Sequence, residues 1–344
     1  MRTQEYDEQT TATPVPRQAS DPAARRRPGR AGRRRVLTAC GAVALVPAAA
    51  VLAARALDVD GPAPLPQLLA FLPWLLVPGW LALACGFLAR RALLSCGAVA
   101  VLAATAWFVQ PYGPDRAAPP GAPHAQVRVL TANLEFGQAT GALLDVLRRE
   151  RPHLVAVQEC DRRCAAALET SALRETYPYR VIAGSGPAEG SALLSVYPLS
   201  DSGEIPGVLS MPGAVADVRG VPVRVQVVHP MPPRLGSMTA WREELAAVRR
   251  AAEDRGEVRT VIAGDFNATQ DHAAFRAVLD TGLRDSARLL GHSRTPTWPS
   301  ATAPPFGAQI DHVLLSERLV PVDARFLDLP GTDHRALLTD VQVH

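Results

Sequence analysis

Residues 259–268 read RTVIAGDFNA, an apolar run that stops at an acid, an aromatic ring and an amide. The β-branched and small side chains of 260–263 are typical of a buried strand. Asp265 and Asn267 follow the end of that strand, where loops commonly carry the polar groups of functional sites. A lone acid at a strand end most often belongs to a turn or caps a helix. The remaining strands therefore decide whether Asp265 is such a structural residue or part of a functional site.

Apolar stretches on both sides of this segment end in the same way. Working outward, six strand ends carry polar residues: Asn133, Glu159, His229, Asp265 with Asn267, Asp311, and Asp333 with His334. Helical patterns separate the strands, most clearly at 237–255, where apolar residues recur every three or four positions. The alternation predicts an α/β protein. Repetition at six strand ends favours one shared site over six unrelated caps.

Three of these residues suit a metal ion. The carboxylates of Glu159 and Asp333 and the amide of Asn133 are hard oxygen ligands, which Mg²⁺ and Mn²⁺ prefer. Such an ion binds a phosphate oxygen, neutralises developing charge and polarises water. We therefore expect a divalent metal at Glu159, Asn133 and Asp333.

The other polar residues suit proton transfer and phosphate binding. His334 and His229 are able to hold or protonate phosphoryl oxygens, and Asp311 is able to orient the imidazole of His334. Asp265 is suited to accept a proton from an attacking water. We predict these four as the catalytic residues of a phosphoester-cleaving site.

The ordered set resembles the endonuclease/exonuclease/phosphatase superfamily, which includes pancreatic deoxyribonuclease, neutral sphingomyelinases and inositol-polyphosphate 5-phosphatases. The matching pieces are TAN at 131–133, VQE at 157–159, GSALLS at 190–195, His229, GDFNA at 264–268, IDH at 310–312 and TDH at 332–334. The resemblance implies a four-layer α/β sandwich of two mixed sheets flanked by helices. It also implies a metal-dependent hydrolase in which Asn267 and His229 contact the substrate phosphate. It leaves open whether His334 is a general base or a phosphate stabiliser.

The first third of the chain has a different character. Residues 1–35 are polar and arginine-rich, which predicts a disordered basic tail. Three runs without a charged residue follow, at 36–54, 68–89 and 92–109, each near the ~20 residues that a bilayer-spanning helix needs. We expect three transmembrane helices in 36–109, a Pro-rich linker at 110–126 and the catalytic domain at 127–344. Buried core helices are the alternative.

Arginines set the expected orientation. Residues 25–35 carry seven arginines, the loop 58–67 carries two aspartates and no arginine, and Arg90 with Arg91 forms the next turn. The positive-inside rule then places the N-terminus in the cytoplasm and the catalytic domain outside, in a multi-pass membrane protein. The arginines at 33–35 also resemble an export signal. Cleavage of the first run would still leave two spans.

The types of charged residue and the cysteines exclude or disfavour several classes of function. All 36 basic residues are arginine, which excludes a P-loop and lysine Schiff-base chemistry. Residues 120–344 carry 23 arginines against 26 acids, and Val196 stands where many superfamily members carry a basic residue, so nucleic acid is a disfavoured partner. Cys160 and Cys164 form either a disulfide or a pair of thiols one helical turn apart.

The sequence thus predicts a membrane-tethered, outward-facing phosphoesterase acting on phosphate monoesters, diesters or pyrophosphates. Its expected partners are membrane lipids and lipid-linked phosphates of the cell envelope. Spans followed by this domain resemble membrane-anchored teicoplanin-resistance proteins, which implies a role in the response to glycopeptide antibiotics. The alternatives are an extracellular nuclease and a catalytically silent receptor or scaffold on the same fold.

Overall fold

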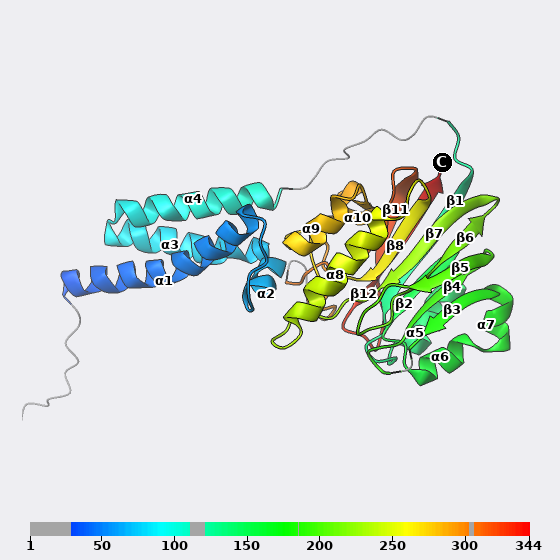
Figure 1. Cartoon of the computed structure of the whole chain (residues 1–344). Helices are drawn as coiled ribbons and strands as arrows, with labels where there is room; N and C mark the ends of the chain where they lie inside the picture. Colours follow the sequence, from blue (N-terminus) through cyan, green and yellow to red (C-terminus); the bar gives the residue numbers. More distant parts are fainter. Residues whose placement is uncertain (1–28, 111–120, 185, 303–305) are drawn as a thin grey trace, which may run out of the picture.

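The computed structural model describes residues 29–110, 121–184, 186–302 and 306–344, and arranges them as a helical projection attached to a two-sheet domain (Figure 1). Most of the predicted tail at 1–35 and of the linker at 110–126 lies outside these residues. The described part of the tail differs from the prediction, because residues 30–35 form the first turns of a helix. At the other end of the linker, the first strand already begins at Ala125.

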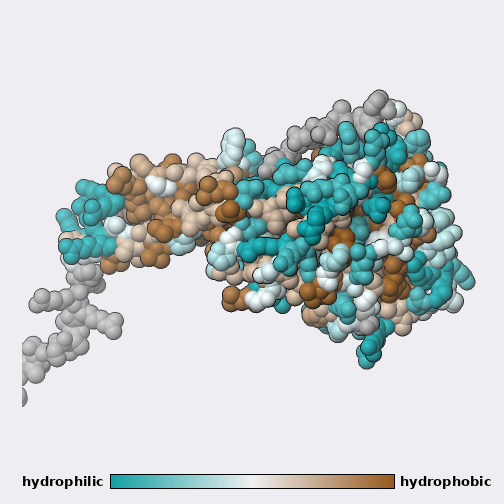
Figure 2. Space-filling view, in the orientation of Figure 1, coloured by the Kyte–Doolittle hydropathy of each residue, from teal (hydrophilic) through white to brown (hydrophobic). Residues whose placement is uncertain are grey.

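The projection contains α1 (Arg30–Ala56), α2 (Leu65–Ala70), the 3₁₀ helix η1 (Leu72–Leu75), α3 (Leu76–Ala89) and α4 (Ala92–Phe108). Arg30–Ala56 and Leu72–Ala89 are long and apolar enough to cross a membrane, whereas the apolar α4 has only 17 residues. Figure 2 shows hydrophobic residues along the projection and hydrophilic residues at its far end.

The second expected span, at 68–89, is divided in the structure. Phe71 leaves the helical conformation, and Pro73 occupies the first turn of η1. Proline lacks the backbone N–H that a continuing helix would use, and it fits the first turn of a new one. The apolar run therefore contains the short α2 and a separate helical segment from Leu72.

The two-sheet domain has a four-layer order. One sheet contains, side by side, β11 (Leu319–Asp328), β12 (Arg335–Val343), β1 (Ala125–Asn133), β2 (Leu154–Gln158), β4 (Ser191–Ser195) and β3 (Tyr179–Ala183). The other contains β5 (Leu199–Glu204), β6 (Pro212–Val218), β7 (Val221–Val228), β8 (Arg259–Asp265), β10 (Asp311–Leu315) and β9 (Arg284–Asp285). Only β1 with β2 and β7 with β8 pair in parallel, so both sheets are mixed, as predicted.

Alternating side chains explain the layers. In β1, Val127 and Val129 face the second sheet, while Leu130 and Ala132 face a helical layer. That layer holds α5 (Thr140–Glu150), α6 (Arg162–Leu168) and α7 (Ser171–Thr176). The opposite layer holds α8 (Met238–Glu253) and α9 (Ala273–Leu279), while α10 (Ser286–Leu289) packs on the core between the two sheets. The expected helix at 237–255 is α8, whose apolar face packs on the second sheet.

Strand register brings the polar strand ends together. In the parallel pair β1 and β2, Asn133 lies opposite Gln158, so Asn133 and Glu159 leave the first sheet at the same edge. In the second sheet, Asp265 on β8 lies directly opposite Asp311 on β10. The facing sheets therefore present acids and amides to one region.

Candidate active site

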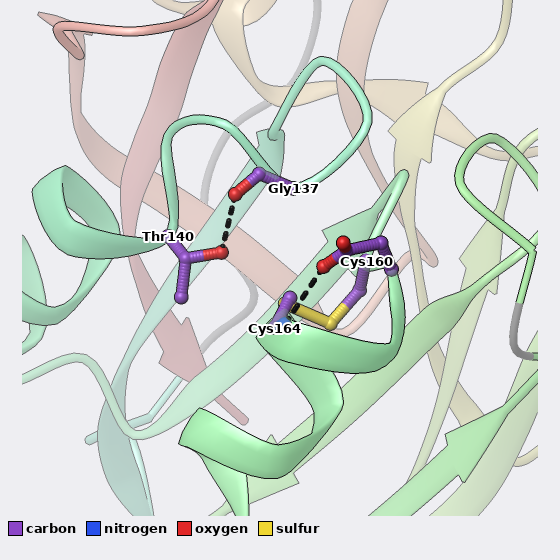
Figure 3. Close-up of a disulfide and its surroundings, with 5 residues drawn as sticks. Gly137, Thr140, Cys160 and Cys164 are labelled. Atoms are coloured by element: carbon purple, nitrogen blue, oxygen red, sulfur yellow. Dashed lines mark hydrogen bonds between the residues drawn. A yellow bond between two sulfur atoms is a disulfide. The ribbon is translucent and has the colours of Figure 1, made fainter.

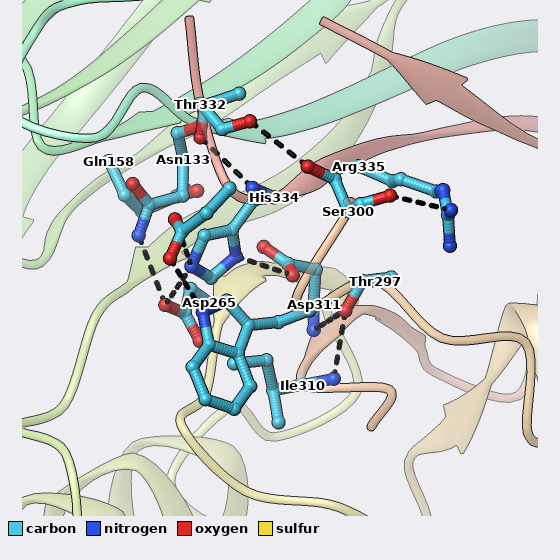
Figure 4. A network of polar contacts seen from close by, with 12 residues as sticks. Asn133, Gln158, Asp265, Thr297, Ser300, Ile310, Asp311, Thr332, His334 and Arg335 are labelled. Carbon is cyan, nitrogen blue, oxygen red and sulfur yellow. Dashed lines mark hydrogen bonds and ion pairs between the residues drawn. The ribbon is translucent and has the colours of Figure 1, made fainter. Parts of the chain in front are cut away.

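One buried histidine lies at the centre of the site. His334 precedes β12, and its Nδ1 is 2.9 Å from Oδ2 of Asp311. Its Nε2 is 3.8 Å from Oδ2 of Asp265 and 3.7 Å from Oδ1 of Asp333. Figure 4 shows Asp311 and Asp265 on opposite sides of the His334 ring. The ring thus joins carboxylates that the sequence separates widely.

Asn133 links two further carboxylates. Its Nδ2 donates to Oε1 of Glu159 and to Oδ2 of Asp265, both at 3.1 Å. Its Oδ1 accepts from the backbone N–H of Glu135 at 3.0 Å. The amide expected as a metal ligand instead holds Glu159 and Asp265 side by side, with its oxygen already engaged.

Glu159 is held in an unusual backbone conformation. Its φ of 54° lies in the left-handed region, which few residues other than glycine adopt, and Asn267 has a φ of 47°. Oε2 of Glu159 accepts from the N–H of Phe136 at 2.9 Å. Such conformations persist where surrounding contacts enforce them, and they gather at functional sites.

A disulfide fixes the segment that follows Glu159. Cys160 and Cys164 are bonded, which resolves the alternative that the sequence left open. Figure 3 shows the bond at the start of α6, beside the turn that carries Gly137 and Thr140. A Cβ at Gly137, whose φ is +80°, would lie 2.4 Å from Oδ1 of Asp161, which caps α6 by accepting from the N–H of Cys164. Glycine is therefore required at this turn.

His229 occupies the far side of the cluster. Its side chain is 2% exposed, and its Nε2 lies 3.7 Å from Glu159 Oε1 and 3.8 Å from Asp265 Oδ2. Among the described residues, its Nδ1 has no hydrogen-bond partner. Burial and the neighbouring His334 lower the pKa of His229 to about 3, so the ring is neutral at physiological pH.

Burial and charge shift the other groups in opposite directions. Burial raises the pKa of Asp265 to about 7 and also raises the pKa of Glu159. Burial acts against protonation of His334, but the carboxylates of Asp311 and Asp265 outweigh it and raise the pKa of His334 to about 10. The site is thus arranged around an imidazolium and several crowded acids.

The crowded acids fit a divalent cation. Asp265, Asp311 and His334 form a group whose polar atoms all lie within 4.8 Å of one another, and its two carboxylates are the donors while His334 is protonated. Oδ1 of Asp311 is buried and makes no hydrogen bond to any described residue. Hard oxygen donors whose charged form is disfavoured by burial are stabilised by such an ion. The group with the closest spacing shares no member with the expected set of Glu159, Asn133 and Asp333.

The structure brings together all eight predicted site residues. Asn267 is beside them, but its Nδ2 donates to the carbonyl of Pro230 at 3.0 Å, and its N–H donates to Oδ1 of Asp265 at 2.8 Å. Asp333 is the most accessible of the acids, with a side chain that is 45% exposed. It lies at the mouth of the site.

Several supporting residues were not predicted. Nε1 of Trp298 donates to Asp333 Oδ2 at 2.8 Å, and Oε2 of Glu135 accepts from the N–H of Asp333 at 2.8 Å. Oγ1 of Thr297 accepts from the N–H of Asp311 at 3.1 Å. The sequence leaves open whether Trp298 lines the mouth of the site or packs in the core, and its Pro-rich loop has no periodicity that would point to Thr297.

Two other buried histidines lie elsewhere. His312 contacts Asp285 Oδ2 through Nδ1 at 2.5 Å and packs against Phe275, so it faces the helical layer. His272 is 1% exposed. Its Nε2 lies 2.8 Å from the carbonyl oxygen of Pro66, in the segment between α1 and α3, which covers it.

Comparison with solved structures shows the same fold. D. rerio TDP2 complexed with a single-strand DNA product matches with a TM-score of 0.53 and 14% identity, over 64% of this chain and 100% of that one. The 3′ phosphatase NExo from Neisseria, bound to a product DNA hairpin, matches with a TM-score of 0.50 and 19% identity, over 62% of this chain and 98% of that one.

Sequence comparisons give the relationship directly. A comparison with curated proteins gives no significant match. The profile of the Endonuclease/Exonuclease/phosphatase family matches residues 130–334, which include every predicted site residue. With its two mixed sheets and its acids and histidines gathered at their common edge, the chain belongs to the Endonuclease/Exonuclease/phosphatase family.

Proposed function

We propose that this protein is a divalent-metal-dependent phosphoesterase tethered to the outer face of a membrane. The observation that carries the proposal is the pairing of Asp311 with His334, whose other nitrogen faces Asp265. An acid that orients a histidine toward a second acid is an arrangement suited to hydrolysis. Members of this family are typically metal-dependent hydrolases of phosphoester bonds.

The residues divide the chemistry as follows. Asp311 accepts a hydrogen bond from the Nδ1–H of His334, so Nε2 is the nitrogen that meets the substrate. With its raised pKa, His334 acts as a cation that stabilises phosphoryl oxygens, and Asp265 accepts the proton of the attacking water. His229 and Asn267 bind the phosphate.

Glu159 and Asp333 are the proposed metal ligands, and Asn133 positions Glu159 beside Asp265. A bound Mg²⁺ or Mn²⁺ would neutralise phosphate charge and polarise the water. The buried Oδ1 of Asp311 makes no hydrogen bond to any described residue and is available to a bound group. The donor set is therefore rich enough in acids for a divalent cation.

The membrane tether is proposed from the helical projection. Arg90 and Arg91 lie between α3 and α4, and residues 30–35 begin α1, so arginines gather at the end away from the catalytic domain. Asp58 and Asp60 lie at the opposite end. This asymmetry supports three spans with the catalytic domain outside. The disulfide between Cys160 and Cys164 fits an oxidising compartment.

The proposed substrates are phosphate monoesters, diesters or pyrophosphates of envelope lipids. A nuclease is the second candidate, because D. rerio TDP2 and Neisseria NExo have the same fold and were solved with DNA. The excess of acids over arginines in 120–344 favours the lipid substrate, since DNA affinity depends on phosphate neutralisation. The intact set of acids and histidines argues against a silent scaffold.

Hydrolysis by the full chain tests the function, measured as phosphate from a pyrophosphate, phosphocholine from sphingomyelin or shortened strands from DNA. A polyprenyl pyrophosphate, sphingomyelin and duplex DNA are offered in parallel, with Mg²⁺ and with a chelator. We expect metal-dependent release from the lipid pyrophosphate that Glu159→Gln abolishes. The exposed Glu243→Gln is the matched control and should retain activity. Cleavage of DNA alone would support the nuclease.

The biological setting has its own test. The likeness to teicoplanin-resistance membrane proteins predicts that a strain without this protein changes its sensitivity to teicoplanin. Complementation with the wild-type chain should restore the original sensitivity, and complementation with Glu159→Gln should not. Restoration by both would separate the antibiotic response from hydrolysis.

A further inference from the structure

We propose that the loop 231–237, with the sequence MPPRLGS, contacts the lipid surface next to the helical projection. Leu235 enters the interface of the outer leaflet, and Arg234 lies at the level of the lipid phosphates. The proposal rests on the membrane tether proposed above. It goes further by naming the surface of the catalytic domain that meets lipid and the side from which substrate arrives.

Leu235 is the most exposed large apolar side chain in the described part of the catalytic domain, at 90%. Its exposure belongs to a formed turn. Oγ of Ser237 donates to the carbonyl of Pro232 at 2.6 Å, and the N–H of Arg234 donates to Oγ of Ser237 at 3.2 Å. Gly236 supplies the positive φ, +95°, at the end of the turn. The turn therefore presents an apolar side chain beside an exposed arginine.

This turn lies against the helical projection. Nε2 of Gln67 donates to the carbonyl of Pro233, and the next residue, Leu68, is 43% exposed. Arg242, one turn into α8, donates to the carbonyl of Gly61. Figure 1 shows the start of α8 beside α2. The apolar tip is thus continuous with the end of the helices that are proposed to span the membrane.

A set of polar contacts holds the catalytic domain against the helical projection. Both carboxylate oxygens of Asp60 accept from backbone N–H groups at the start of α9, those of Ala273 at 2.7 Å and Ala274 at 2.9 Å. Asp271 pairs with Arg294 at 2.6 Å and with Arg55 of α1 at 3.4 Å. These contacts are buried or half-buried. They therefore fix the position of the loop 231–237 along the direction of α1.

The same turn is joined to the active site. It begins directly after Pro230, whose carbonyl accepts from Asn267, and His229 precedes Pro230. The N–H of Met231 donates to Oε2 of the buried Glu244 at 2.6 Å. A lipid contact at Leu235 therefore holds the phosphate-binding residues next to the bilayer. The substrate class that fits is a phosphoester whose lipid tail stays in the same leaflet.

The test uses the full chain reconstituted into vesicles of phosphatidylethanolamine and phosphatidylglycerol. A fluorescent non-canonical amino acid replaces Leu235, and lipids brominated in their acyl chains quench it only if it reaches the bilayer. We expect strong quenching at 235. The matched control is position 322, because Val322 is also exposed but belongs to β11, whose residues 319–321 pair with 341–343 and which Figure 1 shows away from α2. Equal quenching at both positions, or none at 235, overturns the proposal, including the case in which a protein covers Leu235.

Intrinsic tryptophan emission distinguishes a failure of the loop contact from a failure of the membrane tether. Trp80 and Trp107 are 62% and 70% exposed on α3 and α4. If brominated lipids quench tryptophan but not position 235, the loop contact is wrong and the tether stands. If they quench neither, the proposed membrane tether fails as well.

Turnover gives a second readout. Leu235→Asp should lower kcat/KM about tenfold for a polyprenyl pyrophosphate in vesicles, the factor expected when one apolar side chain no longer enters lipid. A water-soluble short-chain pyrophosphate should be cleaved as before. Leu235→Phe should restore the vesicle activity. An equal loss on both substrates would mean that Leu235 serves the site or the fold, and would overturn the proposal.

Discussion

Nδ1 of His334 lies 2.9 Å from Oδ2 of Asp311, although 22 residues separate the two in the sequence. The contact exists because Asp311 begins β10 of one sheet and His334 precedes β12 of the other. The interface between the sheets therefore builds the pair. It also fixes which imidazole nitrogen faces Asp265.

Replacing the acid of this pair should disable the enzyme while leaving it folded. Asp311→Asn removes the charge that orients His334 and stabilises its cation, so we expect kcat to fall by about 10²–10⁴. Asp323→Asn is the matched control, since Asp323 is exposed on β11. Steady-state phosphate release and circular dichroism measure activity and folding. Full activity in Asp311→Asn would remove His334 from the mechanism.

Metal binding should depend on Glu159. Titration calorimetry of the chelator-treated chain should detect a Mg²⁺ or Mn²⁺ site, and Glu159→Gln should weaken it at least about tenfold. Asn133→Ala should weaken it less, because Asn133 acts by holding Glu159 in place. Wild-type affinity in Glu159→Gln would show that Glu159 is not a metal ligand and would favour a site at the cluster of Asp265, Asp311 and His334.

The contact between the projection and the catalytic domain should depend on Asp60. Asp60→Ala leaves two N–H groups at the start of α9 without their acceptor, which costs about 0.5–2 kcal/mol for a cap of this kind. Hydrogen exchange at Ala273 and Ala274 should accelerate. Asp58→Ala removes only the exposed pair with Arg276 and should change exchange little. The same exchange in all three proteins would show that Asp60 does not cap α9.

Acid should loosen the same contact through His272. Burial lowers the pKa of His272 below its ordinary 6.5, although Asp60 and Asp271 act in the opposite direction. Below pH 6.5 the unfolded chain takes up a proton that the folded His272 resists, so the free energy of unfolding falls with pH. The slope contributed is at most about 1.4 kcal/mol per pH unit.

Thermal unfolding of the detergent-solubilised chain across this pH range measures the effect. The difference between wild type and His272→Asn isolates the share of His272, because the other titrating groups are common to both. The variant should lose stability less steeply as the pH falls. Parallel pH profiles would show that His272 is protonated equally in the folded and unfolded states.

The sequence predicted the strands that carry the site, because an apolar run ending in a polar residue is a local signal. The sequence could not predict that Asn133 holds two carboxylates. That role depends on the fold, which places Glu159 and Asp265 within hydrogen-bond distance of the same amide nitrogen. Nor did the loop of Thr297 and Trp298 carry a pattern. Their hydrogen bonds to Asp311 and Asp333 form only after the sheets have paired.

The contact between the projection and the catalytic domain was also beyond local patterns. The arginine pattern predicts Asp60 only as part of the outer loop 58–67, and no local pattern marks His272. Both are buried because segments more than 200 residues apart in the sequence meet, as in the contact of Asp60 with Ala273. The single span expected at 68–89 is divided at Phe71 because Pro73 starts a new helical segment. Apolar composition alone did not reveal this break.

The most direct measurement is phosphate release from a polyprenyl pyrophosphate by the full chain in vesicles, with Mg²⁺ and then with excess chelator. Wild type, His334→Ala and the exposed-site control Glu243→Gln are compared at equal protein. The account predicts metal-dependent release by wild type and Glu243→Gln, and a loss of about 10²-fold or more in His334→Ala. Release that persists in chelator, or that His334→Ala leaves unchanged, would contradict it.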